Sequence, residues 1–253
     1  MSDAEIAQHA LRCLDLTDLT DNCTDQSIDA LCRKALDPRG PVAAVCVWPQ
    51  FVKRAQEVLR GSPVRIATVV NFPAGGEDID RVTDDVQEAL SDGANEIDLV
   101  LPYEAVRRGN LRIATEMVEA VRDLVDQGRL LKVILETGEL KDPTLIETAS
   151  RLSIEAGADF IKTSTGKTPV SATPESAAIM LDVIKASGRN VGLKPSGGIR
   201  TLADARTYLD LAERIMGPGW ATPQTFRIGA SSVYDTLMAA IEGRDGAAAT
   251  GAY

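Results

Sequence analysis

Histidine is nearly absent from this sequence, since His9 is the only one in 253 residues. A triad with a histidine base would have to use it, and it stands in a polar segment, residues 3–10, that has the pattern of a short helix. The four cysteines, Cys13, Cys23, Cys32 and Cys46, form neither a C-x-x-C pair nor a cluster with His9. We therefore expect no metal site, and we expect His9 to be a solvated surface residue.

Long apolar runs are also missing, as is a leader with a charged start and an apolar centre. This predicts a cytoplasmic protein with reduced thiols. Positive charge is scarce, because 27 Lys and Arg stand against 37 Asp and Glu, for a net charge of -10. That balance predicts neither a nucleic acid nor a membrane as partner, so an anionic substrate would need a local pocket of N–H groups and a few cations.

Short apolar runs alternate with amphipathic helical patterns, which is typical of βα units around a parallel sheet. The runs are residues 11–17, 43–48, 65–71, 96–101, 131–136, 159–164, 190–195 and 226–230. The helical patterns are residues 25–36, 50–59, 78–91, 112–127, 143–156, 174–186, 202–215 and 231–242. An open doubly wound sheet is the rival, but the G-x-G-x-x-G fingerprint is absent after the first run. We predict an α/β fold, a single (β/α)8 TIM barrel over 1–253 with an extra N-terminal helix and a mobile tail at 243–253.

Polar side chains occupy alternate positions of several runs, and the opposite positions are aliphatic. Because side chains alternate between the two faces of a strand, the aliphatic face is expected to meet the helices. The charged residues predicted to point into the barrel are Asp15, Asp98, Lys132, Lys162 and Lys194. Buried ion pairs can be purely structural, but active sites of this fold lie at the carboxyl ends of the strands, where Lys162 and Lys194 stand.

A lysine attacks a carbonyl only as the free amine, so its pKa must be lowered by burial or by a nearby cation. Lys162 and Lys194 on adjacent strands could satisfy both conditions, with Asp15 and Asp98 passing protons through water. The alternative is that the two lysines only clamp an anion.

Glycine- and serine-rich loops follow the last three runs: Ser-Thr-Gly-Lys at 164–167, Ser-Gly-Gly-Ile-Arg at 196–200 and Gly-Ala-Ser-Ser at 229–232. Loops after the last strands are the usual phosphate site of this fold, because N–H groups and a helix N-terminus face the anion. Each loop alone could equally be a set of turns and a helix cap. Together they predict a phosphate site.

At these residues the chain resembles the deoxyribose-phosphate aldolases, class I lyases, over nearly its whole length. The segments that carry the resemblance are LDLTDL at 14–19, VCVWP at 45–49, VVNFPAG at 69–75, EIDLVLP at 96–102, KVILETGEL at 132–140, DFIKTSTGK at 159–167, KPSGGIRT at 194–201 and RIGASS at 227–232. The two lysine segments, FIKTSTGK and KPSGGIR, are the most specific.

The resemblance implies a role for individual residues. Lys162 is similar to the Schiff-base lysine, Lys194 to the lysine that perturbs it, and Asp98 to the acid of the proton relay. Asp15 and Thr17 resemble residues around the sugar hydroxyls and water. The residues that resemble the phosphate pocket are Gly166, Lys167, Gly197, Gly198, Arg200, Gly229, Ser231 and Ser232. Cys46 matches a cysteine of the lumen, and Tyr253 a C-terminal tyrosine that assists proton transfer in some relatives, with a disordered tail as the alternative.

The implied reaction is reversible cleavage of 2-deoxy-D-ribose 5-phosphate to D-glyceraldehyde 3-phosphate and acetaldehyde, without a cofactor. The alternatives are a Schiff-base aldolase for another phosphorylated aldehyde or ketone, and a catalytically silent barrel that binds sugar phosphates. The expected partners are small molecules, the sugar phosphate and aldehydes, and the chain could form a homodimer.

Overall fold

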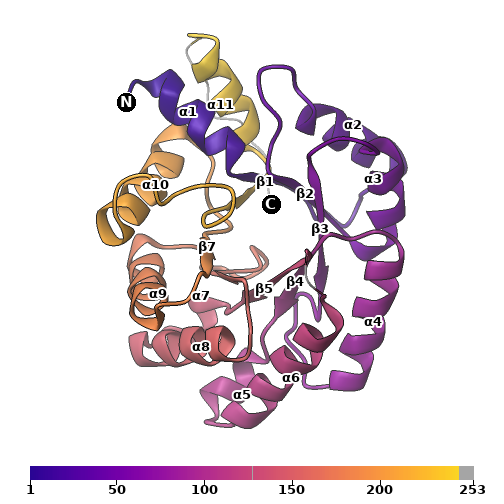
Figure 1. The fold of residues 1–253 in the computed structure, drawn as a ribbon, viewed down its shortest axis with the longest axis vertical. Helices are drawn as coiled ribbons and strands as arrows, with labels where there is room; N and C mark the ends of the chain where they lie inside the picture. The colour runs from indigo at the N-terminus through magenta and orange to yellow at the C-terminus, as the bar shows by residue number, and fades with distance from the viewer. Residues whose placement is uncertain (127, 245–253) are drawn as a thin grey trace.

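The strands of this protein form a closed parallel barrel that helices surround (Figure 1). The computed structural model describes residues 1–126 and 128–244. In those residues the strands are β1 Leu14–Asp18, β2 Ala44–Val47, β3 Arg65–Val70, β4 Glu96–Val100, β5 Leu130–Ile134, β6 Phe160–Lys162, β7 Gly192–Lys194 and β8 Ile228–Ala230. They pair in the order β7-β6-β5-β4-β3-β2-β1-β8. The N–H of Leu193 donates to the Thr225 carbonyl and that of Gly229 to the Pro195 carbonyl, both at 2.9 Å, which joins the two ends.

Helices follow the strands and cover the outside of the barrel (Figure 1). They are α1 Asp3–Arg12, α2 Asp25–Ala35, η1 Pro49–Phe51, α3 Val52–Val58, α4 Ile79–Ser91, α5 Tyr103–Arg107, α6 Leu111–Leu124, α7 Thr137–Leu140, α8 Pro143–Glu155, α9 Pro174–Ser187, α10 Leu202–Met216 and α11 Val233–Ile241. The predicted (β/α)8 barrel with an additional N-terminal helix is therefore confirmed. Within the described ranges, no helix has both the length and the apolar character that crossing a bilayer requires.

Several strands are shorter than the apolar runs predicted. Leu11 lies in α1, so β1 begins only at Leu14. β7 ends at Lys194, one residue before the predicted end at Pro195, which has no N–H to donate, although its carbonyl still accepts the N–H of Gly229. Glu136 has φ of 56°, a left-handed conformation that turns the chain from β5 into α7. The short helices α5 and α7 were not predicted, because one or two turns carry too little periodicity to be detected.

His9 is half-buried, so it is less solvated than predicted. Its Nε2 atom lies 2.5 Å from the carbonyl oxygen of Ala221, in the loop after α10. The helix that carries His9, α1, packs against α11 and α10 beside the barrel (Figure 1). This packing covers one side of a helix whose sequence is polar.

The barrel interior holds a bulky aromatic side chain next to a glycine. A Cβ atom added to Gly192 on β7 would come within 2.2 Å of the ring of Phe160 on the neighbouring strand β6. The ring of Phe160 also lies 5.6 Å from the guanidinium carbon of Arg227. In this pair, a large residue on β6 is accommodated by a small one on β7, which helps to fill the barrel. This layer supports the charged side chains described next.

Candidate active site

Both predicted lysines point into the barrel and converge on one carboxylate. Lys162 ends β6 and Lys194 ends β7, and the two residues are register partners. The Nζ atoms of Lys162 and Lys194 donate to the same Asp98 Oδ2 atom, at 2.8 and 2.7 Å. Asp98 lies on β4, and all three side chains are at most 1% exposed. The sequence prediction of paired lysines in the lumen is therefore confirmed.

Further ion pairs surround this pair of lysines. Lys194 Nζ lies 2.6 Å from Asp15 Oδ2, and Lys132 Nζ lies 3.0 Å from Asp98 Oδ1 and 2.5 Å from Glu96 Oε2. Alternation predicted that Asp15, Asp98, Lys132 and Lys194 face the lumen, and the structure places all four there. Among the described residues, no group of three or more His, Cys, Asp and Glu could hold a metal ion. The carboxylates are occupied instead by ammonium groups.

Arg227 is a charged residue of the lumen to which the sequence analysis gave no role. Its guanidinium donates to Asp15 Oδ1 at 2.6 Å and to Glu96 Oε1 at 2.9 Å, and the side chain is 3% exposed. Glu96 is fully buried and received no role either. A signal was present, because Arg227 stands at the alternate position to Phe226 and Ile228 in an otherwise apolar run. The same alternation that selected Lys162 would have selected it.

The surroundings of the two lysines drive their pKa values in opposite directions. Burial lowers the pKa of Lys162, and the charge of Lys194 lowers it further against the opposing effect of Asp98. Burial also disfavours the charged form of Lys194, but the carboxylates of Asp15 and Asp98 overcome it and raise the pKa of Lys194 well above its usual value. A lysine with a lowered pKa beside a permanently charged one is the arrangement that a Schiff-base nucleophile needs. Lys162 is the residue that can be an amine.

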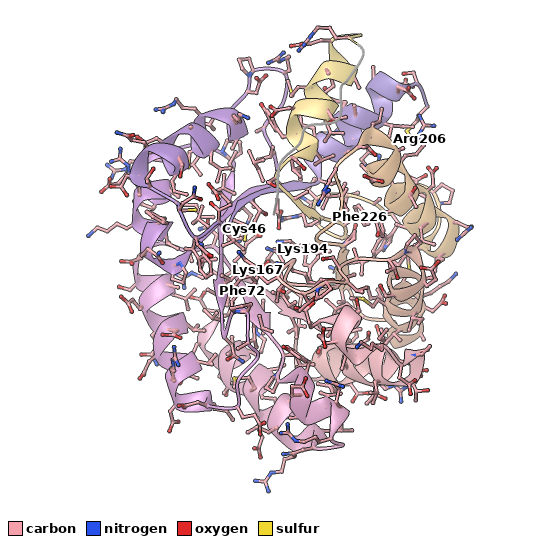
Figure 2. All side chains as sticks on the ribbon, turned by 180° about the vertical axis from the view of Figure 1, so that it is seen from behind. Cys46, Phe72, Lys167, Lys194, Arg206 and Phe226 are labelled. Atoms are coloured by element: carbon pink, nitrogen blue, oxygen red, sulfur yellow. The ribbon has the colours of Figure 1, made fainter. Side chains whose placement is uncertain are left out.

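Thr17 and Cys46 lie at the edge of this cluster. The Thr17 hydroxyl donates to the carbonyl of Asp15 at 2.8 Å on β1, and Cys46 on β2 is fully buried. Burial raises the pKa of the Cys46 thiol, so it is uncharged. In Figure 2 the labelled Cys46 and Lys194 lie near the middle of the molecule. The structure thus brings these predicted residues to the site.

The loops after β6 and β7 touch each other at glycines. Gly166, Gly197 and Gly198 have φ of 81, 80 and 79°, a region that favours glycine. A Cβ atom on Gly197 would lie 2.6 Å from the Ser171 hydroxyl and 3.2 Å from the Cα atom of Gly166. The two loops therefore approach as closely as backbone allows, and the N–H of Gly197 donates to the Gly229 carbonyl at 3.3 Å, which links them to β8.

The remaining predicted phosphate residues lie around these loops. Lys167 Nζ donates to the Leu19 carbonyl at 2.7 Å and lies 5.8 Å from the ring of Trp48. Ser232 is the N-cap of α11 and makes no capping bond with its side chain, and Ser231 precedes it. Arg200 is exposed and has its N–H bonded to Asp204 Oδ2 at 2.9 Å, before α10.

Gly229 approaches Lys194 directly. A Cβ atom on Gly229 would lie 2.5 Å from the Ser196 hydroxyl and 3.0 Å from the Cε atom of Lys194. Tyr253 lies outside the described residues.

Glu136 holds the loop after β6 and was not predicted as a site residue. Its carboxylate accepts the N–H of Thr165 at 3.3 Å, the Thr165 hydroxyl, and the Thr168 hydroxyl at 3.3 Å. The Thr165 hydroxyl in turn accepts the N–H of Lys167 at 3.0 Å. Burial raises the pKa of Glu136. This carboxyl group fixes the segment that carries Lys167.

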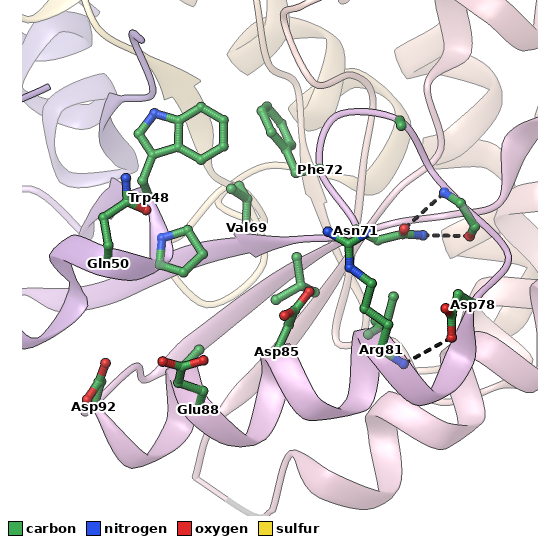
Figure 3. A pocket seen from close by; sticks show the side chains of 16 residues that line it. Trp48, Gln50, Val69, Asn71, Phe72, Asp78, Arg81, Asp85, Glu88 and Asp92 are labelled. Carbon is green, nitrogen blue, oxygen red and sulfur yellow. Dashed lines mark hydrogen bonds between the residues drawn. The ribbon is translucent and has the colours of Figure 1, made fainter. Parts of the chain in front are cut away.

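A separate hollow of about 440 Å³ lies outside the barrel, between the segment after β2 and helix α4 (Figure 3). Trp48 and Phe72 stand at its inner side, with ring centroids 5.4 Å apart at an interplanar angle of 82°. Its α4 side carries Asp78, Asp85, Glu88 and Asp92 alongside Arg81. None of the lumen lysines lines it, and its acidic side disfavours an anionic substrate.

Known proteins are similar to this chain in both sequence and fold. Residues 9–232 match the model of the DeoC/LacD family aldolases. A curated deoxyribose-phosphate aldolase from Agrobacterium fabrum (strain C58) is 50% identical over 250 residues, which is 98% of this chain and 96% of that protein.

Two solved structures support the same relationship. A protein from Coccidioides immitis, provisionally assigned as a deoxyribose-phosphate aldolase, is 32% identical, with a TM-score of 0.80 over 90% of this chain and 85% of that one. The deoxyribose phosphate aldolase from Aeropyrum pernix, described as tetrameric, is 26% identical, with a TM-score of 0.77 over 94% and 92%. With a family match over most of its length and a half-identical relative, the chain belongs to the DeoC/LacD family of aldolases.

Proposed function

We propose that this aldolase reversibly cleaves 2-deoxy-D-ribose 5-phosphate to D-glyceraldehyde 3-phosphate and acetaldehyde, with Lys162 as the Schiff-base lysine. The observation that carries the proposal is the shared Asp98 oxygen, which holds Lys162 and Lys194 side by side in a buried site. The half-identical Agrobacterium fabrum protein carries the name of this activity. The named activity of this relative and the arrangement of Lys162 and Lys194 therefore support the same reaction.

In the cleavage direction, the neutral amine of Lys162 attacks the aldehyde carbon of the open-chain sugar. Loss of water gives a protonated imine, which withdraws electrons from the neighbouring carbons. The bond between the second and third carbons breaks as the hydroxyl on the third carbon loses its proton, and glyceraldehyde 3-phosphate leaves. An enamine of acetaldehyde remains on Lys162, is protonated on carbon, and is released by water.

Asp98 and Lys194 manage the protons of these steps together with water. The burial of Asp98 disfavours its charge, but the cations Lys132 and Lys194 hold its pKa well below the usual range, so Asp98 is a carboxylate that stabilises the imine cation. Asp15 keeps Lys194 charged from the other side. Thr17 and Cys46 contact the sugar chain and water. In some relatives a C-terminal tyrosine assists, and we propose Tyr253 for this role.

The phosphate of the substrate binds at the loops after β6, β7 and β8. We expect the N–H groups of Gly166 and Gly198 to bind the anion, while Gly197, whose N–H donates to the Gly229 carbonyl, lets the loops approach each other, and Lys167 supplies local positive charge in a chain of net charge -10. Gly229, Ser231 and Ser232 add the N-terminal end of α11, and Arg200 contributes from the start of α10. No cofactor is required, because the imine supplies the electron sink.

We further propose that residues 1–253 act as one barrel domain in the cytoplasm and that the chain associates as a homodimer. A tetrameric assembly of the Aeropyrum pernix relative supports association in general, and barrels with exposed helical faces commonly associate. Light scattering of the purified chain measures its assembly directly.

Imine trapping tests the assignment of Lys162. Borohydride added with acetaldehyde should increase the mass of the peptide that contains Lys162, and Lys162→Ala should abolish this label. Lys185→Ala is the matched control, because Lys185 lies on the surface and donates to the Ile215 carbonyl. Labelling that persists in Lys162→Ala would overturn the proposal.

A related Schiff-base aldolase for another phosphorylated aldehyde or ketone is the second candidate, since the matching family is wider than one substrate. Turnover of deoxyribose 5-phosphate should exceed turnover of ketose phosphates under the same conditions. An aldol assay that a chelator does not inhibit separates both enzymes from a silent sugar-phosphate-binding barrel.

A further inference from the structure

Six charged side chains inside the barrel form a closed ring of ion pairs, which we call the ion ring. The ring passes in order through Asp98, Lys194, Asp15, Arg227, Glu96 and Lys132, with the paired N and O atoms 2.7, 2.6, 2.6, 2.9, 2.5 and, back at Asp98, 3.0 Å apart. Negative and positive groups alternate around it. The members come from β1, β4, β5, β7 and the residue just before β8, and each is at most 3% exposed.

The ion ring is electrically neutral, because its three carboxylates match its three cations. Lys162 is an additional amine, and in the described part of the chain its ion pair is with Asp98. A protonated Lys162 would place an unbalanced positive charge where the side chain is 1% exposed, and an unbalanced buried charge is costly. A neutral Lys162 leaves the interior balanced.

Two other titratable groups lie near Lys162. Cys46 on β2 is an uncharged thiol, and Glu136, after β5, bonds the hydroxyl and N–H of Thr165 rather than the ion ring. Burial raises the pKa of Glu136 and so disfavours a carboxylate that would balance a charge on Lys162. At the opposite end of the barrel, the Arg65 Nε atom on β3 is buried against Glu96 at 2.8 Å, but the side chain as a whole is 34% exposed, so water partly screens its charge. The balance within the ion ring therefore depends on its buried members.

We infer that Arg227 and Glu96 are positioning residues that set the charge state of Lys162 through the ion ring rather than by contact with substrate. Arg227 supplies the third cation, so that Asp15 and Glu96 are neutralised without help from Lys162. Loss of Arg227 leaves the ring one charge negative, and protonation of Lys162 then restores neutrality. Loss of Glu96 leaves the ring one charge positive and disfavours that protonation. This inference rests on the proposed role of Lys162.

The test measures the apparent pKa of Lys162 from the pH dependence of imine trapping with acetaldehyde and cyanoborohydride. Arg227→Gln should raise the apparent pKa of Lys162 by about one unit, which lowers the trapping rate about tenfold at pH values below that pKa. Glu96→Gln should lower the apparent pKa by a similar amount. The double variant, R227Q with E96Q, should return it to the value of the unmodified protein. The matched control is Arg122→Gln, an arginine paired with Asp159 on the outer side of the barrel, which should leave it unchanged.

Equal pKa values in all variants, or shifts of R227Q and E96Q in the same direction, would overturn the inference. Circular dichroism shows whether R227Q folds. If it does not, the downward pKa shift in E96Q and the reversal of that shift in the double variant still test the role of the ion ring. Mass mapping of the trapped adduct separates this result from failure of the proposed function. A label on another residue refutes the role of Lys162, whereas a label on Lys162 with unmoved pKa values refutes only the role of the ion ring.

Discussion

Replacing Lys194 by methionine tests whether its charge keeps Lys162 neutral. The two donor bonds end on one Asp98 oxygen and are 2.8 and 2.7 Å long, so the two nitrogen atoms are within about 5.5 Å of each other. At an effective dielectric constant of about 20, two like charges at that distance repel by about 3 kcal/mol. Removal of this repulsion should raise the pKa of Lys162 by about two units, since one unit corresponds to about 1.4 kcal/mol.

The expected consequence is a shift of the pH profile. At neutral pH, kcat/KM for cleavage of deoxyribose 5-phosphate should fall about 100-fold in Lys194→Met, because the unprotonated fraction of Lys162 falls about 100-fold. The acid limb of the profile should move to higher pH by about two units, and part of the activity should return above it.

The profile also separates the charge of Lys194 from its part in proton transfer. Lys185→Met, a substitution on the surface, serves as the control and should leave the profile unchanged. A loss of activity that is equal at all pH values would refute the reasoning, because it would mean that Lys194 transfers protons without tuning Lys162.

Three further predictions follow from other contacts. Gly192→Ala should lower the free energy of unfolding by about 1–3 kcal/mol in urea denaturation, because the new methyl group meets the ring of Phe160, and a stability equal to that of the unmodified protein would contradict this packing. Burial opposes the charge of Asp15, but Lys132, Lys194 and Arg227 lower its pKa. The contribution of Asp15 to stability is therefore complete at pH values above its pKa in the unfolded chain, about 3.9, and is lost as the pH falls from there through its lower pKa in the folded protein. Asp15→Asn should accordingly flatten the acid-induced loss of stability below about pH 4. Glu136→Ala should release the Thr165 loop and raise KM for the phosphorylated substrate, while acetaldehyde trapping, which needs no phosphate, should change little.

The alternation of residue types along the chain was sufficient to predict the fold and the inward-facing lysines. Each run of the sheet has a period of two, so the face of Asp98, Lys132 or Lys162 can be assigned from its immediate neighbours. The glycine-rich loops after the last three runs can also be recognised from short stretches of sequence. The structure brings Gly197 close to the Cα atom of Gly166 in the neighbouring loop. Boundaries were less certain, because the ends of β7 and β8 depend on where the ladder closes.

Tertiary structure alone decided which of these charges meet. Asp15 and Arg227 are 212 positions apart and bond only because β8 closes against β1, and the register of that closure is set by the whole barrel. The half-burial of His9 depends in the same way on the packing of α1 beside α11. The sequence by itself thus determined which side chains enter the lumen, through the local period of the strands. The folded barrel decided that two lysines share one oxygen and that the surrounding charges balance, because those contacts join strands distant in the chain.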